Sequence, residues 1–197
     1  VLIMACLILI IDVFLEQRQR HITYGLAQMT LLGAALLTLT TYAHAPVTTM
    51  FGLYIKDAMG DLLKLFIYLA SAAVFLYSRD YLRCRDLFKG EYYVLGLFGV
   101  LGMMIMVSAH SLLSVYMGME LLSLSLYALV AIDRDSPVAS EAAMKYFVLG
   151  SLASGILLYG ISMIYGATGS VNLQVVSDAV ARQGIDNLVL VFGLVFL

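Results

Sequence analysis

The stretch Leu112–Ile132 reads LLSVYMGMELLSLSLYALVAI, and Glu120 is its only charged residue. A helix of about 20 predominantly apolar residues is long enough to cross the hydrocarbon core of a bilayer. This stretch therefore predicts a transmembrane helix that carries one acidic side chain inside it. A charge at the bilayer centre costs at least ~2.5–3.5 kcal/mol on insertion scales, and by default such residues mark functional sites.

The composition of the whole chain agrees with a membrane protein. Of its 197 residues, 62% are hydrophobic and 12% are charged, whereas a soluble domain has about 25% charged residues. The mean hydropathy is +0.97. The net charge of −2 offers no basic surface for nucleic acid. These values exclude a soluble enzyme and a nucleic-acid-binding protein.

The hydrophobic runs predict five complete spans and two truncated ones. In lipid, each backbone N–H must be satisfied within its own segment, so the expected fold class is all-α: a polytopic transmembrane helix bundle forming a single domain over 1–197. The first and last runs are shorter than a span needs, and we expect both to be parts of longer helices in a longer chain. The expected spans are 1–15 (truncated), 22–43, 62–78, 92–109, 112–132, 138–165 and 188–197 (truncated).

Basic residues predict the orientation of the chain. The loops after the second, fourth and sixth runs hold only Lys56 and Arg182, with Lys64 at the edge of a span. Cytoplasmic loops carry the excess of Lys and Arg, so the basic loops are expected in the cytoplasm and the amino-terminal end outside. The loops after the first, third and fifth runs hold Arg18, Arg20, Arg79, Arg83, Arg85, Lys89 and Arg134.

Three short segments between the spans also carry local signals. Met50–Ile55 is β-prone. Ser136 followed by Pro137 predicts a helix start, with Ser as the cap and Pro at the first helical position. Apolar residues at helical spacing within 173–180 predict a short amphipathic helix at the outer interface.

The residues that hold redox or hydrolytic centres are not arranged for that chemistry. No histidine has a partner at mid-membrane to hold a haem between helices. Cys6 and Cys84 are far apart, which provides no iron–sulfur or zinc spacing and no evident disulfide. The three histidines, at span ends or in loops, are His21, His44 and His110.

A second charge, Lys145, lies within the span that follows Glu120. Counted from the turn between the two spans, Glu120 is about 20 Å deep and Lys145 about 12 Å deep, at 1.5 Å per residue. Spans joined by so short a turn are antiparallel neighbours. An offset of about 8 Å makes an ion pair, direct or through one water, feasible. A shift in the charge of Glu120 would then change how readily Lys145 holds its proton.

Each charge also has a structural interpretation. Glu120 can be a locked carboxylate that hydrogen-bonds to a neighbouring helix. Lys145 can pair with Glu141, four residues earlier, or extend its ammonium group toward the cytoplasm. For Lys64, a surface pair with Asp61 at the outer end of its span is favoured over a role in a relay.

Polar and small residues near the two charges are compatible with either a packed helix interface or a hydrated proton path. One stripe at helical spacing consists of Tyr116, Glu120, Ser123 and Tyr127. In the next span, small residues predict a close helix–helix contact. These residues are Gly150, Ser151, Ser154 and Gly155.

Two sequence segments resemble a known family. MGMELLSLSLYALV (117–130) and EAAMKYFVLG (141–150), continuing through GILLYG (155–160), closely resemble subunit N of bacterial NADH–quinone oxidoreductase (respiratory complex I). The resemblance is strong over about 90–170. It implies an antiporter-like bundle built from inverted five-helix repeats. It also implies that Glu120 and Lys145 match the family's glutamate in the fifth helix and lysine in the sixth.

The resemblance further implies a proton-translocating subunit of the membrane arm of the complex, a translocase in the bacterial inner membrane. Glu120 and Lys145 would form its proton relay, with further relay residues beyond Leu197. It implies no cofactor or metal in this chain: NADH, FMN, the iron–sulfur clusters and quinone belong to partner subunits. Expected partners are the other membrane-arm subunits, the lipid bilayer and protons. Two alternatives stay open, a subunit of a multi-subunit sodium/proton antiporter and a non-pumping structural membrane subunit.

Overall fold

The computed structural model describes residues 1–14, 21–42, 45–85, 87–183 and 187–197. Within these ranges the chain forms eight helices and one small hairpin. The elements are α1 (Leu2–Phe14), α2 (His21–Thr40), β1 (Val47–Thr49), β2 (Tyr54–Lys56), α3 (Ala58–Cys84), α4 (Gly90–Val107), α5 (Leu112–Val130), α6 (Pro137–Thr168), α7 (Leu173–Gln183) and α8 (Leu188–Phe196).

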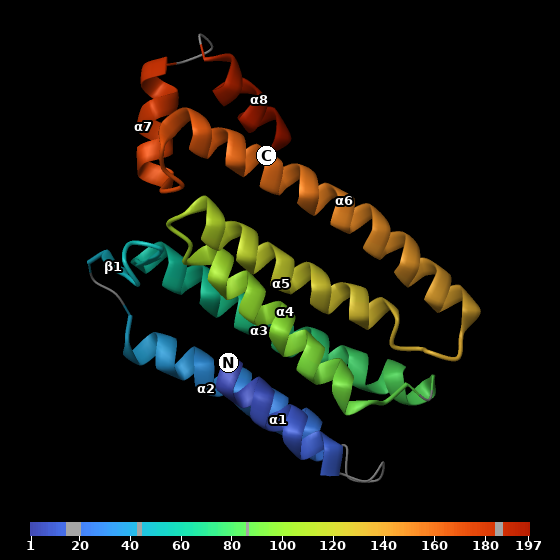
Figure 1. Cartoon of the computed structure of the whole chain (residues 1–197). Helices are drawn as coiled ribbons and strands as arrows, with labels where there is room; N and C mark the ends of the chain where they lie inside the picture. Colours follow the sequence, from blue (N-terminus) through green and yellow to red (C-terminus); the bar gives the residue numbers. More distant parts are fainter. Residues whose placement is uncertain (15–20, 43–44, 86, 184–186) are drawn as a thin grey trace.

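The expected all-α transmembrane bundle is confirmed. Helices α2 to α6 are each long and apolar enough to cross a membrane. Figure 1 shows α3, α4 and α5 in the middle of the bundle, with α1 and α2 on one side and α6 on the other. The most extensive contact is between α4 and α5, and α8 packs along α6. The predicted loop residues Arg18, Arg20 and His44 lie outside the described residues.

Helix α3 extends beyond the predicted span 62–78 at both ends. At its start, the Asp57 side chain accepts a hydrogen bond from the backbone N–H of Gly60 at 2.9 Å, which caps the helix. At its other end, the guanidinium of Arg79 lies over the ring of Tyr24, with its carbon 4.9 Å from the ring centroid. This cation–π contact gives the charge a partner on α2, so the helix continues past the first arginine.

The predicted start of α6 is confirmed. The Ser136 hydroxyl accepts from the backbone N–H of Ala139 at 3.3 Å, and Pro137 is the first helical residue. Helix α6 ends at Thr168, where Gly169 adopts a left-handed conformation with φ of 72°. The helix expected within 173–180 is present as α7, and its Val176 is buried against the neighbouring helices.

The hairpin confirms part of the expectation for Met50–Ile55, because Tyr54 and Ile55 lie in a strand, and corrects the rest. The strands are β1 and β2, paired antiparallel from Val47 with Lys56 to Thr49 with Tyr54. The residues between the strands form the turn, in which Met50, Phe51 and Gly52 all have positive φ. The chain must reverse between two very short strands, so the β-prone side chains of the turn cannot extend the ladder.

Two buried clusters hold the bundle together. The first contains side chains of α1, α2, α3 and α4, and Tyr93 lies at its centre with 0% of its surface exposed. The second joins α5 to α6, α7 and α8 through Leu112, Ile161, Ile164 and Leu190. Helix α5 therefore connects the two halves, since it packs on α4 through one face and on α6 through the other.

Candidate functional site

Glu120 lies near the middle of α5 and is half-buried. Its carboxylate accepts a hydrogen bond from the hydroxyl of Ser154 on α6. No cation pairs with it among the described residues. The single acidic side chain of this span is therefore held by a neutral hydroxyl group.

The orientation of Glu120 follows from the packing of α5 on α4. Gly118 faces α4 so closely that a Cβ atom there would lie 2.7 Å from the carbonyl oxygen of Gly102. Ser125 lies on the same face of α5 as Gly118 and is also buried. Since successive residues turn by about 100° around a helix, Glu120 points about 200° away from Gly118. The α4 contact thus directs Glu120 toward α6.

Lys145 lies on a different face of α6 from the one that meets α5. Its ammonium group forms an ion pair with Glu141 at 2.5 Å, and the two side chains are 70% and 65% exposed. The residues of α6 that contact α5 at this level are Tyr146 and Phe147. Within the described part of the chain, no hydrogen bond or ion pair joins Lys145 to Glu120. The pairing within α6, one of the structural interpretations, is the contact observed.

The register of α5 against α6 places the two charges farther apart than the sequence count does. Ser154 lies opposite Glu120, and the ring of Tyr127 packs edge-on against Phe147 with centroids 5.7 Å apart. Both contacts agree with one antiparallel register, in which Lys145 is level with Leu129. Nine residues separate that level from Glu120, which is about 13–14 Å along the helix axis. The expected offset of about 8 Å is therefore too small.

The difference has a simple cause. The sequence count starts both helices at the same depth, next to their connecting turn. In the structure α5 ends at Val130, while α6 begins at Pro137 and continues past the end of α5 (Figure 1). The first two turns of α6 extend beyond α5, and Lys145 lies just above them.

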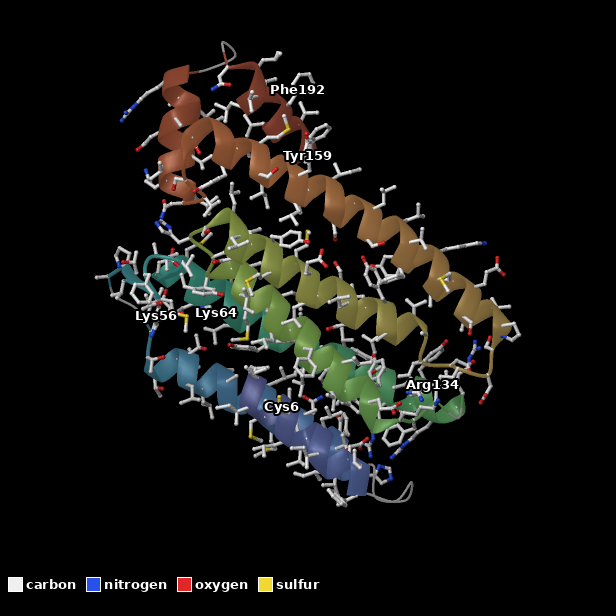
Figure 2. All side chains as sticks on the ribbon, in the orientation of Figure 1. Cys6, Lys56, Lys64, Arg134, Tyr159 and Phe192 are labelled. Atoms are coloured by element: carbon white, nitrogen blue, oxygen red, sulfur yellow. The ribbon has the colours of Figure 1, made fainter. Side chains whose placement is uncertain are left out.

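Other charged groups occupy separate places. Lys64 pairs with Asp61 at 3.2 Å, as expected, but the expected surface location is wrong: the two side chains are only 13% and 2% exposed. Figure 2 shows Lys64 near Lys56 at one end of the bundle and Arg134 at the other. Asp12 of α1 accepts a hydrogen bond from the buried Thr23 hydroxyl at 2.7 Å.

Cysteine and histidine side chains are likewise dispersed. Cys6 and Cys84 are free and exposed on α1 and α3. His21 contacts Arg83, with 2.9 Å between its Nδ1 and the guanidinium. Among the described residues, no group of three or more His, Cys, Asp or Glu side chains is placed to hold a metal ion.

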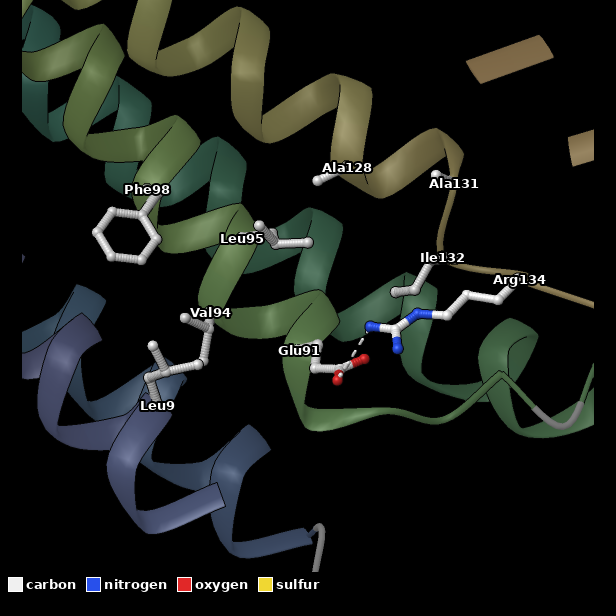
Figure 3. A pocket seen from close by; sticks show the side chains of 9 residues that line it. All are labelled: Leu9, Glu91, Val94, Leu95, Phe98, Ala128, Ala131, Ile132 and Arg134. Atoms are coloured by element: carbon white, nitrogen blue, oxygen red, sulfur yellow. Dashed lines mark hydrogen bonds and ion pairs between the residues drawn. The ribbon is translucent and has the colours of Figure 1, made fainter. Parts of the chain in front are cut away.

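One cavity of about 280 Å³ lies between α3, α4 and α5. Two further cavities beside α5 border polar or charged groups. Figure 3 shows the first, of about 390 Å³, lined almost entirely by apolar side chains of α1, α4 and α5 and bordered by the exposed Arg134–Glu91 pair at 3.5 Å. The second, of about 550 Å³, lies between α5, α6 and the end of α8. Its polar and small lining residues are Ser123, Tyr127, Tyr146, Gly150 and Ser154. Only the second adjoins the hydrogen bond of Glu120.

The sequence did not reveal the role of Ser154. Its spacing with Gly150 indicates helix packing, which is also what these residues do in the structure. The signal that could have singled it out is its register, because only a residue of α6 opposite Glu120 can serve the carboxylate. That register depends on how far α6 extends beyond α5.

Comparisons with known proteins agree with this arrangement. The family model described as "NADH:quinone oxidoreductase/Mrp antiporter, TM" matches residues 109–197, which include Glu120 and Lys145. NADH-quinone oxidoreductase subunit N of Thioalkalivibrio sulfidiphilus is 59% identical over the whole chain, and that of Thiobacillus denitrificans is 57% identical. The chain spans 41% of the length of each of these two relatives.

A solved structure supports the same assignment. A chain of respiratory complex I from Thermus thermophilus has a TM-score of 0.72 and 28% sequence identity, covering 98% of this chain and 41% of that one. The sequence identity to the relatives extends over all the described helices, and the fold matches over nearly the same length. Over its whole length, this chain is therefore similar to NADH-quinone oxidoreductase subunit N of these bacteria.

Proposed function

We propose that this chain is part of a proton-translocating subunit in the membrane arm of an NADH–quinone oxidoreductase, and that Glu120 binds the transported proton. The observation that carries the proposal is the Glu120–Ser154 hydrogen bond inside the bundle. A carboxylate that faces a lysine or arginine is locked in its charged form. Glu120 has a hydroxyl partner instead.

A hydroxyl group suits a carboxyl group that changes its protonation state. The Ser154 hydroxyl donates to the carboxylate, and the same oxygen can accept from a protonated carboxylic acid. The hydrogen bond therefore persists in both states, and neither state leaves an unpaired polar atom between α5 and α6. This property favours a relay over a permanently charged structural group.

In this proposal Lys145 is the second relay group. It lies about 13–14 Å from Glu120 along the helix axis, so protons pass between the two through intermediate groups rather than by direct contact. Its ammonium group forms an ion pair with the exposed Glu141. A change in the charge of Glu120, or of another group that approaches Lys145, would change how readily Lys145 holds its proton.

The similar relatives and the charge distribution support a setting for the subunit. The similarity to relatives named NADH-quinone oxidoreductase subunit N supports a position among other membrane-arm subunits, in the bilayer of a bacterial inner membrane. NADH, FMN, iron–sulfur clusters and quinone would lie in those partners. The excess of basic residues in the loops after α1, α3 and α5 supports a cytoplasmic position for these loops and an amino-terminal end outside.

A second candidate function is a subunit of a sodium/proton antiporter, because the matching family model covers both kinds of protein. The names of the two relatives described above favour the oxidoreductase. Sodium-dependent proton exchange in membranes that lack NADH would favour the antiporter.

The test uses the full-length subunit in its assembled complex, in inverted membrane vesicles. We expect Glu120→Gln to lower the rate of NADH-driven proton uptake by ~10-fold or more, since a positioned proton-transfer group contributes about 10²–10⁴-fold. Lys145→Ala should lower it as well. The matched control is Glu91→Gln, whose carboxylate is exposed at the start of α4 and pairs with Arg134. Normal pumping by assembled Glu120→Gln and Lys145→Ala complexes would support a structural subunit.

A further inference from the structure

The interface between α5 and α6, called the seam below, runs along the helix axis from the position of Glu120 to that of Lys145. Along it, Glu120 and Ser154 lie at one level and Tyr127 with Tyr146 lies about 10 Å nearer the loop between the helices. Lys145 directly precedes Tyr146 in the sequence. A proton that moves between the two charged groups has to cross this distance.

Tyr127 is held in the seam by its ring. The ring packs edge-on against Tyr146, with centroids 4.7 Å apart and planes at 90°, and against Phe147 in the same manner. Its hydroxyl oxygen lies directly over Gly150, where an added Cβ atom would be 1.8 Å away. Gly150 therefore leaves the space that the hydroxyl occupies.

Hydroxyl groups of α5 and α6 line part of the cavity at this seam. Its volume of about 550 Å³ exceeds the ≈30 Å³ of a water molecule many times. Ser123, one turn along α5 from Glu120, lines it together with Tyr127 and Ser154. Water in the cavity would find the two to four polar partners that an ordered water requires.

We propose that the Tyr127 hydroxyl passes protons to Glu120 through water in this cavity. A hydronium ion on the loop side gives one proton to the Tyr127 oxygen and becomes water, while the hydroxyl proton of Tyr127 moves to water on the Glu120 side, which passes one proton to the carboxylate. The hydroxyl ends neutral, and the Glu120 carboxylate ends protonated. Ser154 keeps its hydrogen bond to the carboxyl group throughout. This inference rests on the proposed function of Glu120.

The experiment removes or displaces one hydroxyl group of the seam in the full-length subunit within its complex. Tyr127→Phe removes the hydroxyl but keeps the ring that contacts Tyr146 and Phe147. We expect NADH-driven proton uptake to fall ~10-fold or more, and the solvent deuterium isotope effect on coupled NADH oxidation to rise. The matched control is Tyr77→Phe on α3, whose side chain is 80% exposed and makes no contact with the seam.

A second variant separates the hydroxyl from the ring packing. Gly150→Ala keeps the Tyr127 hydroxyl but displaces it, because the new methyl group takes its place. It should lower proton uptake in the same direction. If Tyr127→Phe fails to assemble, the comparison of Gly150→Ala with the control decides the question.

The outcomes distinguish this inference from the proposed function. Reduced uptake in both Tyr127→Phe and Glu120→Gln, with a normal Tyr77→Phe control, supports both. Normal uptake and an unchanged isotope effect in Tyr127→Phe, with reduced uptake in Glu120→Gln, overturns the path through Tyr127 and leaves the role of Glu120 intact. Normal uptake in Glu120→Gln overturns the proposed function itself, and with it the path.

Discussion

The contact between α4 and α5 should not tolerate even one methyl group. Gly102 and Gly118 face each other there, and a Cβ atom at position 102 would lie 2.6 Å from the Gly118 carbonyl oxygen and 2.8 Å from the backbone nitrogen of Leu122. Both neighbours are backbone atoms, which cannot rotate away. Ordinary contacts begin at 3.4 Å, so Gly102→Ala must push the two helices apart by about 0.8 Å at this point.

The expected cost of Gly102→Ala follows from this displacement. Overpacking of a well-packed interior costs about 1–3 kcal/mol, and the α4–α5 contact is the most extensive in the bundle. The variant should therefore lower the thermal stability of the detergent-solubilised full-length subunit, and the shift of α5 should also weaken NADH-driven proton uptake through Glu120. Midpoints of thermal unfolding, followed by the loss of the helical circular-dichroism signal, provide the measurement.

The control for this prediction is Gly33→Ala on α2. An added Cβ atom there has no atom within 4 Å, and alanine has the higher helix propensity by about 1 kcal/mol. Its stability should equal or exceed that of the unmodified protein. Equal midpoints for Gly102→Ala and Gly33→Ala would refute the conclusion that α4 and α5 touch through their backbones.

Three further substitutions test single interactions. Asp61→Asn leaves the buried Lys64 without its anionic partner and should destabilise the protein by about 3–5 kcal/mol; adding Lys64→Met should restore most of the loss in the same unfolding assay. Thr23→Val removes the donor to Asp12, a charge-assisted hydrogen bond of about 1.5–3 kcal/mol, whereas Thr23→Ser should retain stability. Ser136→Ala removes the cap of α6 and should cost about 1 kcal/mol, with a smaller loss for Ser136→Asp; equal losses for both would contradict capping.

Local signals in the sequence predict the elements well, because they act over a few residues. Hydropathy reveals the spans, since each span must satisfy its backbone within itself. Ser136 and Pro137 mark a helix start because their effects are confined to the first turn. The turn at Met50–Gly52 escaped prediction because its positive φ values are imposed by the pairing of β1 with β2, and not by β propensity.

Burial of charged groups is less predictable from local sequence. Lys64 was expected at a surface because a long side chain near a span end reaches the interface. In the structure its partner Asp61 is itself buried, so the pair stays inside the bundle. Whether a charge near a span end is buried depends on the loops and helices that cover that end. Spacing along one helix contains no information about them.

The distance between Glu120 and Lys145 is likewise not predictable from local sequence. Helix lengths gave an offset of about 8 Å between Glu120 and Lys145, because the count assumed that α5 and α6 start level. One contact between the helices, Glu120 with Ser154, sets the register and raises the offset to about 13–14 Å. A direct ion pair of the two charges then requires α6 to slide or rotate against α5. A path of hydroxyl groups and water along the seam needs no such movement, and Gly150 provides the space for it.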